Sequence, residues 1–254
     1  MDLDDFAKAV FDFNERLSSS LYSLANSIVK TISPIEELIT AFAEIIASLY
    51  PSSGEQRRII DSLQKWGEFG WCLIDWVEIE FYHNIPKSIE EADNLVLEYC
   101  SDKIIYGFIE ELRDKVDNII EFDEAIFCYE NEKYTSCSLI LFSIIDSMFI
   151  RMQEKKKNDN RKLALGFSKE LRTSHDHVNF MIETSCLATL NAIKTFFRNG
   201  QDFTNEQQDI ANRNFVSHGM NKRAVTKIDC IKLFLIIKGV FDIKEAYGLE
   251  YKSE

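Results

Sequence analysis

The stretch YTSCSLILFSIIDSMFI, residues 134–150, decides the fold. It is apolar nearly all round a helix, and a helix of that kind is the buried, central element of a larger bundle. Asp146 interrupts the apolar run, so the stretch falls short of the roughly 18 apolar residues that cross a bilayer. We therefore expect a central core helix here, in a cytoplasmic protein without a membrane partner.

Helical signals continue toward the N-terminus. Apolar residues recur at intervals of three and four over residues 1–31, which predicts an amphipathic helix. A second helix is expected over 35–49, a third from about Glu55, and another from Ser88, where Glu91 completes a capping box. Between these last two, the aromatic and glycine-rich segment 66–71 predicts a tight bend that packs against the core.

The C-terminal half is also expected to be helical. Residues 103–153 predict two or three helices, residues 155–162 a basic loop, and residues 174–198 a long helix that ends at Asn199-Gly200. A short helix is expected near Thr204, and a final one near Thr226, where Thr226 and Asp229 fit a capping arrangement. All three prolines lie before residue 87. The predicted fold is all-α.

The two halves of the chain differ in charge. Residues 1–150 carry a net charge of −18, whereas residues 151–238 hold 16 Lys and Arg against 9 Asp and Glu, within a total of −13. The basic part favours a polyanion partner, although a compositional fluctuation would look the same. We expect an N-terminal helical region over 1–105 and a second domain over 106–254, packed together without a flexible linker.

The cysteines and histidines give little sign of a metal site. None of the six cysteines forms a CxxC pair, so we expect buried, reduced thiols. His175 and His177 are two residues apart and lie on different sides of a helix, which suits a helix start better than a pair of metal ligands. We predict neither a metal nor a cofactor.

Residues 212–219, Asn-Arg-Asn-Phe-Val-Ser-His-Gly, form the most informative motif. Arg213 and His218 stand five residues apart between two helices, and the apolar Phe215 and Val216 can anchor the turn in the core. Gly219 ends the turn at a place where a side chain would not fit. The spacing predicts that the arginine and the histidine are held at a helix end.

This segment resembles the RNxxxH signature of the HEPN ribonucleases, including the Asn after Arg and the Gly after His. HEPN domains are helical bundles in which the motif precedes the last long helix, and an earlier buried helix often carries an acidic residue, here Asp146. The resemblance covers roughly residues 118–247, and residues 1–105 loosely resemble the N-terminal regions of phage-defence HEPN proteins.

Physical chemistry points to the same group of residues. A lone carboxylate on the apolar central helix is costly to bury, so Asp146 needs a partner, and Arg213 or His218 would serve. RNA supplies its own nucleophile, the 2′-hydroxyl. Cleavage then needs a base, which a histidine provides, and a cation for the phosphate, which an arginine provides.

The resemblance implies a metal-independent endoribonuclease of a phage-defence or toxin system, with Arg213, Asn214, His218 and Asp146 as catalytic residues. It also implies a 2′,3′-cyclic phosphate product and a homodimer in which two motifs face each other. A tyrosine that some HEPN toxins carry, and that a partner antitoxin modifies, is replaced here by Met220, so we do not expect that mode of control.

The basic residues after the motif, Lys222, Arg223 and Lys227, are candidates for RNA binding. Each site residue also has a structural interpretation: a capping histidine, a salt-bridged arginine, a buried structural acid. The alternative function is therefore a non-catalytic HEPN-like helical module that binds proteins or nucleotides. The RNA substrate, the activating signal and any protein regulator or antitoxin cannot be read from the sequence.

Overall fold

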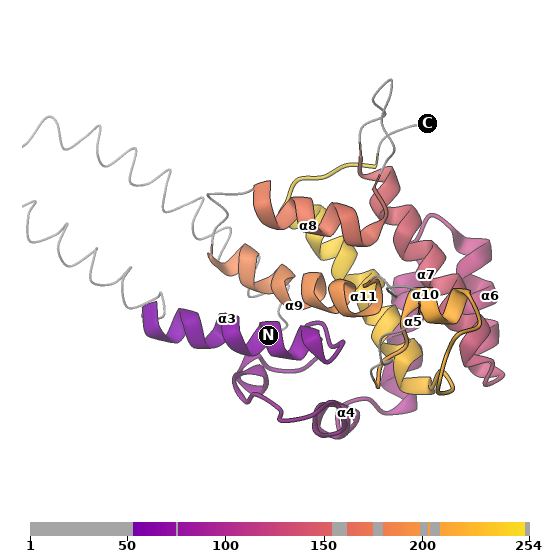
Figure 1. Ribbon diagram of the computed structural model, residues 1–254, viewed down its shortest axis with the longest axis horizontal. Helices are drawn as coiled ribbons and strands as arrows, with labels where there is room; N and C mark the ends of the chain where they lie inside the picture. The colour runs from indigo at the N-terminus through magenta and orange to yellow at the C-terminus, as the bar shows by residue number, and fades with distance from the viewer. Residues whose placement is uncertain are drawn as a thin grey trace, which may run out of the picture. The chain divides into compact units, whose positions relative to one another are not determined.

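The computed structural model describes residues 53–74, 76–153, 162–174, 180–198, 203 and 209–251. These residues form α-helices and one 3-10 helix and contain no strand, which confirms the all-α class (Figure 1). Several predictions lie outside the described residues. They are the helices over 1–31, over 35–49 and near Thr204, most of the 155–162 loop, the helix end at 199–200 and the His175–His177 pair.

The centre of the fold is formed by α6 (Ile119–Glu130), α7 (Tyr134–Arg151) and α11 (Lys227–Ala246). The predicted central helix is confirmed as α7, which packs against both α6 and α11. Helix α11 is buried on nearly every side and passes between α7 and α9 (Phe180–Phe196) (Figure 1). The sequence predicted only where this helix begins, so its central position is a finding of the structure.

Within the described residues, α7 is also the one helix long and apolar enough to cross a membrane by length and composition. Half of that helix is buried inside the bundle, as a core helix would be.

The segment before α6 contains α3 (Ser53–Glu68), the 3-10 helix η1 (Ile79–His83), α4 (Ile89–Leu97) and α5 (Asp102–Arg113). The predicted bend after α3 is confirmed: Trp66 and Trp71 are fully buried, and Gly70 has a left-handed φ of 85°. A side chain at Gly70 would also meet Phe196 of α9. The bend therefore joins α3 to the core through a position that only glycine fills without strain.

A buried ion pair ties α4 to α11. Lys232 is 1% exposed, and its Nζ lies 2.6 Å from Oδ1 of Asp93, which also accepts a hydrogen bond from Nε1 of Trp71. The Lys232 ammonium lies 4.9 Å from the centre of the Trp71 ring. Burial lowers the pKa of Lys232, and Asp93 opposes that effect.

The region between α7 and α9 differs from the prediction. The long helix expected from Ser174 to Arg198 is α9, which begins at Phe180, and an additional helix, α8 (Ala164–Ser174), ends where the prediction placed the start. No element was predicted from the sequence for residues 163–173, which is where most of α8 lies.

The sequence predicted capping boxes at the starts of α11 and α4. Thr226 and Asp229 form the full reciprocal capping box at the start of α11. Ser88 accepts the hydrogen bond from the backbone of Glu91, but the Glu91 carboxylate accepts from the backbone of Lys87 instead of from Ser88. The first box is confirmed, and the second is only half formed.

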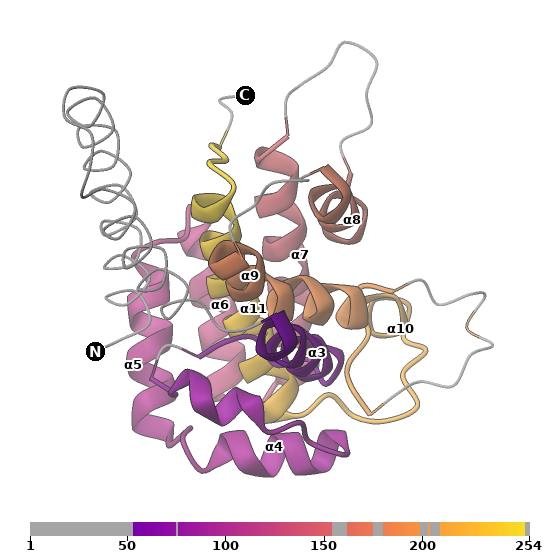
Figure 2. The ribbon, with the colours of Figure 1, turned by 90° about the vertical axis from the view of Figure 1, so that its left-hand side faces the viewer.

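The chain divides into two compact units, Met1–Ile60 and Asp61–Glu254. The predicted boundary at residue 105 falls inside the second unit, because α5 packs against α6 and α11. Helix α10 (Arg213–Ser217) lies at the edge of that unit, near one end of α9, in both views (Figures 1 and 2).

Candidate active site on helix α10

Helix α10 is only five residues long, and its own sequence fixes both of its ends. Asn212 is the N-cap, and its side-chain oxygen accepts hydrogen bonds from the backbone of Asn214 and Phe215. At the other end, Gly219 adopts a left-handed φ of 67°. The backbone N–H of Gly219 donates to Val216 and that of Met220 to Phe215, which is the Schellman arrangement. Gly219 ends the turn as predicted, but a Cβ there would meet nothing within 4 Å, so glycine is favoured by the left-handed φ and not by lack of space.

The bundle holds α10 through its buried side and through α9. Phe215 and Val216 are 3% and 5% exposed, as the predicted anchoring requires. The side-chain amides of Asn212 and Asn214 both donate to the backbone oxygen of Arg198, at 3.1 and 3.0 Å. Asn214 thus fastens α10 to the end of α9, whereas the resemblance implied a catalytic role for it.

Arg213 lies against Asp146 of the central helix. Its Nε is 2.9 Å from Oδ2 of Asp146, whose other oxygen accepts a hydrogen bond from the backbone of Ala164. Asp146 is 6% exposed, and burial raises the pKa of its carboxyl although Ala164 and Arg213 oppose that effect. The sequence predicted Arg213 or His218 as the partner of Asp146, and in the structure the partner is Arg213.

The Arg213 side chain is about one third exposed, and its Nε is the nitrogen closest to Asp146. In the described part of the chain, its two terminal nitrogens have no hydrogen-bond partner. An arginine held through Nε keeps a pair of donors that match the spacing of two phosphate oxygens. The guanidinium is thus both fixed in place and able to bind an anion.

His218 is the C-cap of α10 and is exposed. Its ring makes an edge contact with Phe203, with the ring centres 5.3 Å apart. Five residues of helix separate two side chains by about 140° around the axis, so Arg213 and His218 leave α10 in different directions. Among the described residues, no hydrogen bond or ion pair joins His218 to Arg213 or Asp146 within one chain.

The three basic residues after the motif have different surroundings. Arg223 makes two 2.8 Å hydrogen bonds to the buried carboxylate of Asp229, so its guanidinium supports the fold. Lys227 forms an ion pair with Asp102 on the surface, which raises the Lys227 pKa mainly through that bond. Lys222 is exposed. The RNA-binding roles of Lys222, Arg223 and Lys227 stay predictions, and both Arg223 and Lys227 are paired with carboxylates within the fold.

Two contributors to the site escaped the sequence analysis. Asn212 has a side chain typical of an N-cap one residue before the helix, so local rules would have found it. The backbone oxygen of Arg198 carries no sequence signal, because it reaches α10 only through the packing of α9. No group of three or more His, Cys, Asp or Glu suited to a metal occurs in the described residues, and all six cysteines are free.

Comparison with known proteins adds no assignment. No family model matches the chain, and no curated protein or solved structure matches it at a significant level.

Proposed function

We propose that this chain is a metal-independent endoribonuclease of the HEPN type and that α10 carries its active site. One observation carries the proposal: Arg213 of the RNxxxH motif is fixed by the buried Asp146 while its terminal nitrogens remain open. A purely structural arginine would be expected to use those nitrogens within the fold, as Arg223 does.

The proposed reaction needs one base, one acid and one cation. A neutral His218 accepts the proton of the RNA 2′-hydroxyl, and the 2′-oxygen attacks the adjacent phosphorus. Arg213 neutralises the charge that develops on the phosphoryl oxygens. The P–O bond to the 5′-oxygen breaks, and that oxygen takes a proton as it leaves. The products are a 2′,3′-cyclic phosphate and a 5′-hydroxyl end.

The reaction needs a second group that protonates the leaving oxygen, and a homodimer would supply it. Within one chain, His218 points away from Arg213, so a single motif does not surround a phosphate. Two copies that meet at α10 would bring one histidine to each side of the scissile bond. The proposed assembly is a homodimer in which each site uses both chains.

The direct test is cleavage of a 5′-labelled RNA in EDTA by the full-length protein, with mapping of the product ends. The wild type should give 2′,3′-cyclic phosphate ends, and His218→Ala should lose at least a hundredfold in rate, as expected for a general base. The matched control is His83→Ala, which removes another exposed histidine on η1. Equal loss in both variants, or equal activity in all three proteins, contradicts the proposal.

A second function has one observation in its favour. The Asn214 amide is used to fasten α10 to α9, which is what a motif kept for structure would do. The chain would then be a non-catalytic helical module that binds a protein or a nucleotide. Folded wild-type protein that binds RNA without cleaving it would favour this function.

The biological role is a further proposal. Phage defence or a toxin system and a protein regulator rest on the resemblance of the motif. A cytoplasmic location rests on the interruption of the apolar stretch 134–150 by Asp146. Growth arrest on expression of the wild type, relieved in His218→Ala, is the expected outcome for a toxin.

A further inference from the structure

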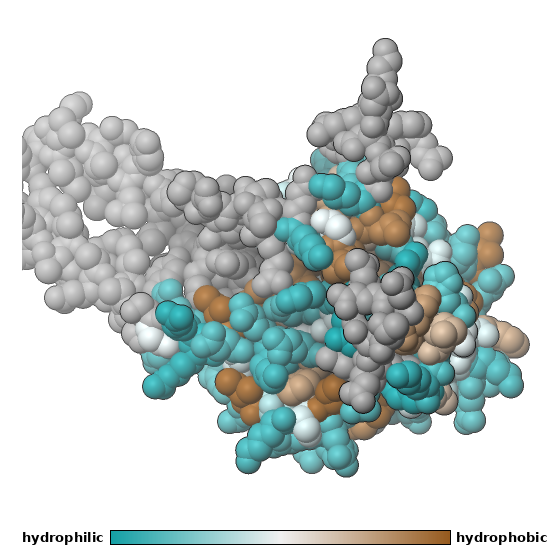
Figure 3. All heavy atoms as spheres, in the orientation of Figure 1, coloured by the Kyte–Doolittle hydropathy of each residue, from teal (hydrophilic) through white to brown (hydrophobic). Residues whose placement is uncertain are grey.

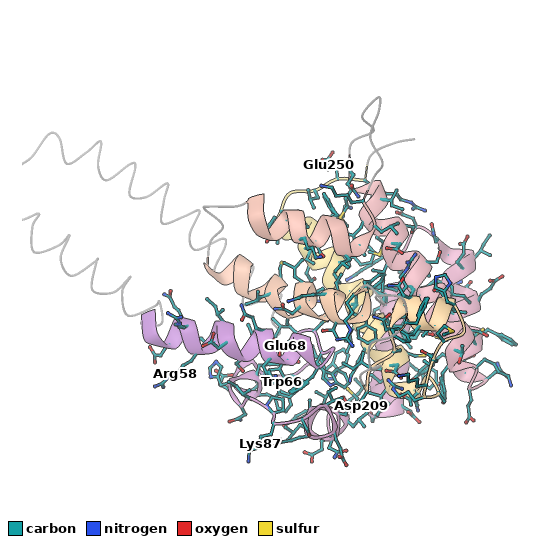
Figure 4. All side chains as sticks on the ribbon, viewed as in Figure 1. Arg58, Trp66, Glu68, Lys87, Asp209 and Glu250 are labelled. Atoms are coloured by element: carbon teal, nitrogen blue, oxygen red, sulfur yellow. The ribbon has the colours of Figure 1, made fainter. Side chains whose placement is uncertain are left out.

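Phe203 lies in the connection between α9 and α10, which also contains Asp209 (Figure 4). Its ring packs against two residues of α10. The centres of the Phe203 and Phe215 rings are 5.4 Å apart, and the two rings are nearly perpendicular, at 87°. The centres of the Phe203 and His218 rings are 5.3 Å apart, at 64°. One phenyl ring therefore contacts both the buried anchor of α10 and the candidate base, in edge-to-face arrangements that are favourable between aromatic rings.

The backbone of Phe203 has an uncommon conformation. Its φ is 58°, in the left-handed region that bulky residues rarely adopt. Such a conformation persists only where the surrounding structure enforces it, and residues of this kind are frequent at functional sites. The ring contacts of Phe203 with Phe215 and His218 are interactions that can offset the cost of this conformation.

The orientation of the His218 ring depends on packing. His218 is exposed, and most of the coloured surface in Figure 3 is hydrophilic. Exposed side chains change rotamer within nanoseconds unless a contact restricts them. In the part of the chain that the structure describes, the His218 ring has no hydrogen-bond or ion-pair partner, and its contact with Phe203 is the interaction that can restrict it.

We infer that Phe203 is a positioning residue whose ring holds the imidazole of His218 in one orientation. Its effect on catalysis rests on the proposed function, in which His218 takes the proton of the RNA 2′-hydroxyl. A base that rotates freely spends only part of its time within reach of that proton, so fixing it raises kcat without changing the affinity for RNA. The orientation itself belongs to the folded chain and is measured without RNA.

The first experiment is NMR spectroscopy of the full-length protein with labelled histidine, for the wild type, Phe203→Leu and Phe203→Tyr. The His218 signals are assigned by their loss in His218→Ala. The Phe203 ring should shift the imidazole proton signals of His218, and this shift should disappear in Phe203→Leu and persist in Phe203→Tyr, which keeps the ring. His83, which is exposed on η1, is the internal control and should give the same signals in these proteins.

The second experiment measures RNA cleavage in EDTA by the same proteins. Phe203→Leu should lower kcat about fivefold at unchanged KM, as expected for the loss of one aromatic pair, whereas Phe203→Tyr should keep the wild-type kcat. Thermal unfolding shows whether each variant is folded. Phe203→Gly, which suits the left-handed φ, takes the place of Phe203→Leu if that variant unfolds.

Identical His218 signals in the wild type and Phe203→Leu overturn the inference. So does a wild-type kcat in folded Phe203→Leu, or a change confined to KM, which would mean that Phe203 contacts the RNA instead. If the wild type does not cleave RNA, the proposed function fails, and the NMR comparison still decides whether Phe203 orients His218.

Discussion

Two buried aspartates, Asp229 and Asp146, are each paired with an arginine, but their pKa values are shifted in opposite directions. Asp229 receives hydrogen bonds from two arginine nitrogens of Arg223, from the backbone of Ala211 and from the backbone and hydroxyl of Thr226. Burial raises the pKa of Asp229, but these bonds outweigh it, so the pKa lies below its usual value. Asp146 has one backbone donor and one nitrogen of Arg213, and its pKa is raised.

The difference separates a pair whose arginine places both terminal nitrogens on its aspartate from a pair that we propose serves a site. Arg223 places both of its terminal nitrogens on Asp229, which stabilises the turn before α11. The Nε of Arg213 lies against Asp146, and its terminal nitrogens have no hydrogen-bond partner among the described residues. An incompletely satisfied buried carboxylate is costly for stability, and such costs are common where function requires them.

The largest expected effect is on stability at Asp229. Asp229→Asn should lower the free energy of unfolding by about 3 kcal/mol, because it leaves the half-buried Arg223 without its charge partner and breaks the capping box of α11. Urea unfolding followed by circular dichroism measures the change. A loss below about 1 kcal/mol would mean that this pair is no more structural than Asp146 and Arg213.

Asp146→Asn should change the free energy of unfolding by less than about 1 kcal/mol, because folding already disfavours the charged form and the exposed Arg213 can be hydrated. Cleavage of RNA should still fall at least tenfold, since the guanidinium loses its anchor. The same urea titration and an RNA cleavage assay in EDTA test this pair of outcomes. A loss as large as that of Asp229→Asn would contradict the comparison.

The smallest expected effect is on the pH dependence of stability. The pKa of Asp229 is depressed on folding, so its stabilisation is present above its unfolded value near 3.8 and is lost as the pH falls through the folded pKa. The pKa of Asp146 is raised, so its protonation as the pH falls toward 3.8 favours the folded state.

Urea unfolding across pH 3 to 6 distinguishes these signs. The difference in free energy of unfolding between the wild type and Asp229→Asn should shrink in acid. The wild type should instead become more stable relative to Asp146→Asn as the pH falls. Parallel curves for the two variants would show that the two carboxylates titrate alike.

Short-range patterns predicted much of this molecule. The apolar residues around Asp146 indicated a central helix, and Gly219 and the Thr226 capping box indicated helix ends that the structure confirms. The need of Asp146 for a partner predicted that Arg213 or His218 lies near it, and the structure has Arg213 there.

Contacts between residues far apart in the chain could not be predicted from the sequence. The burial of Lys232 depends on Asp93 and Trp71, which are far away in the sequence and meet it only when α4 packs on α11. The attachment of Asn214 to Arg198 depends in the same way on where α9 ends. The pairing of Arg223 with Asp229 is local in the sequence. The same residues, however, could equally be interpreted as part of an exposed basic patch, so the pairing could not be predicted.

The most direct test of this account is the rate of RNA cleavage per folded molecule, measured in EDTA for Arg213→Ala and Arg223→Ala beside the wild type. The account predicts that Arg213→Ala remains folded and loses at least a hundredfold in rate, whereas Arg223→Ala unfolds more easily but cleaves normally while folded. Wild-type cleavage by folded Arg213→Ala would contradict it.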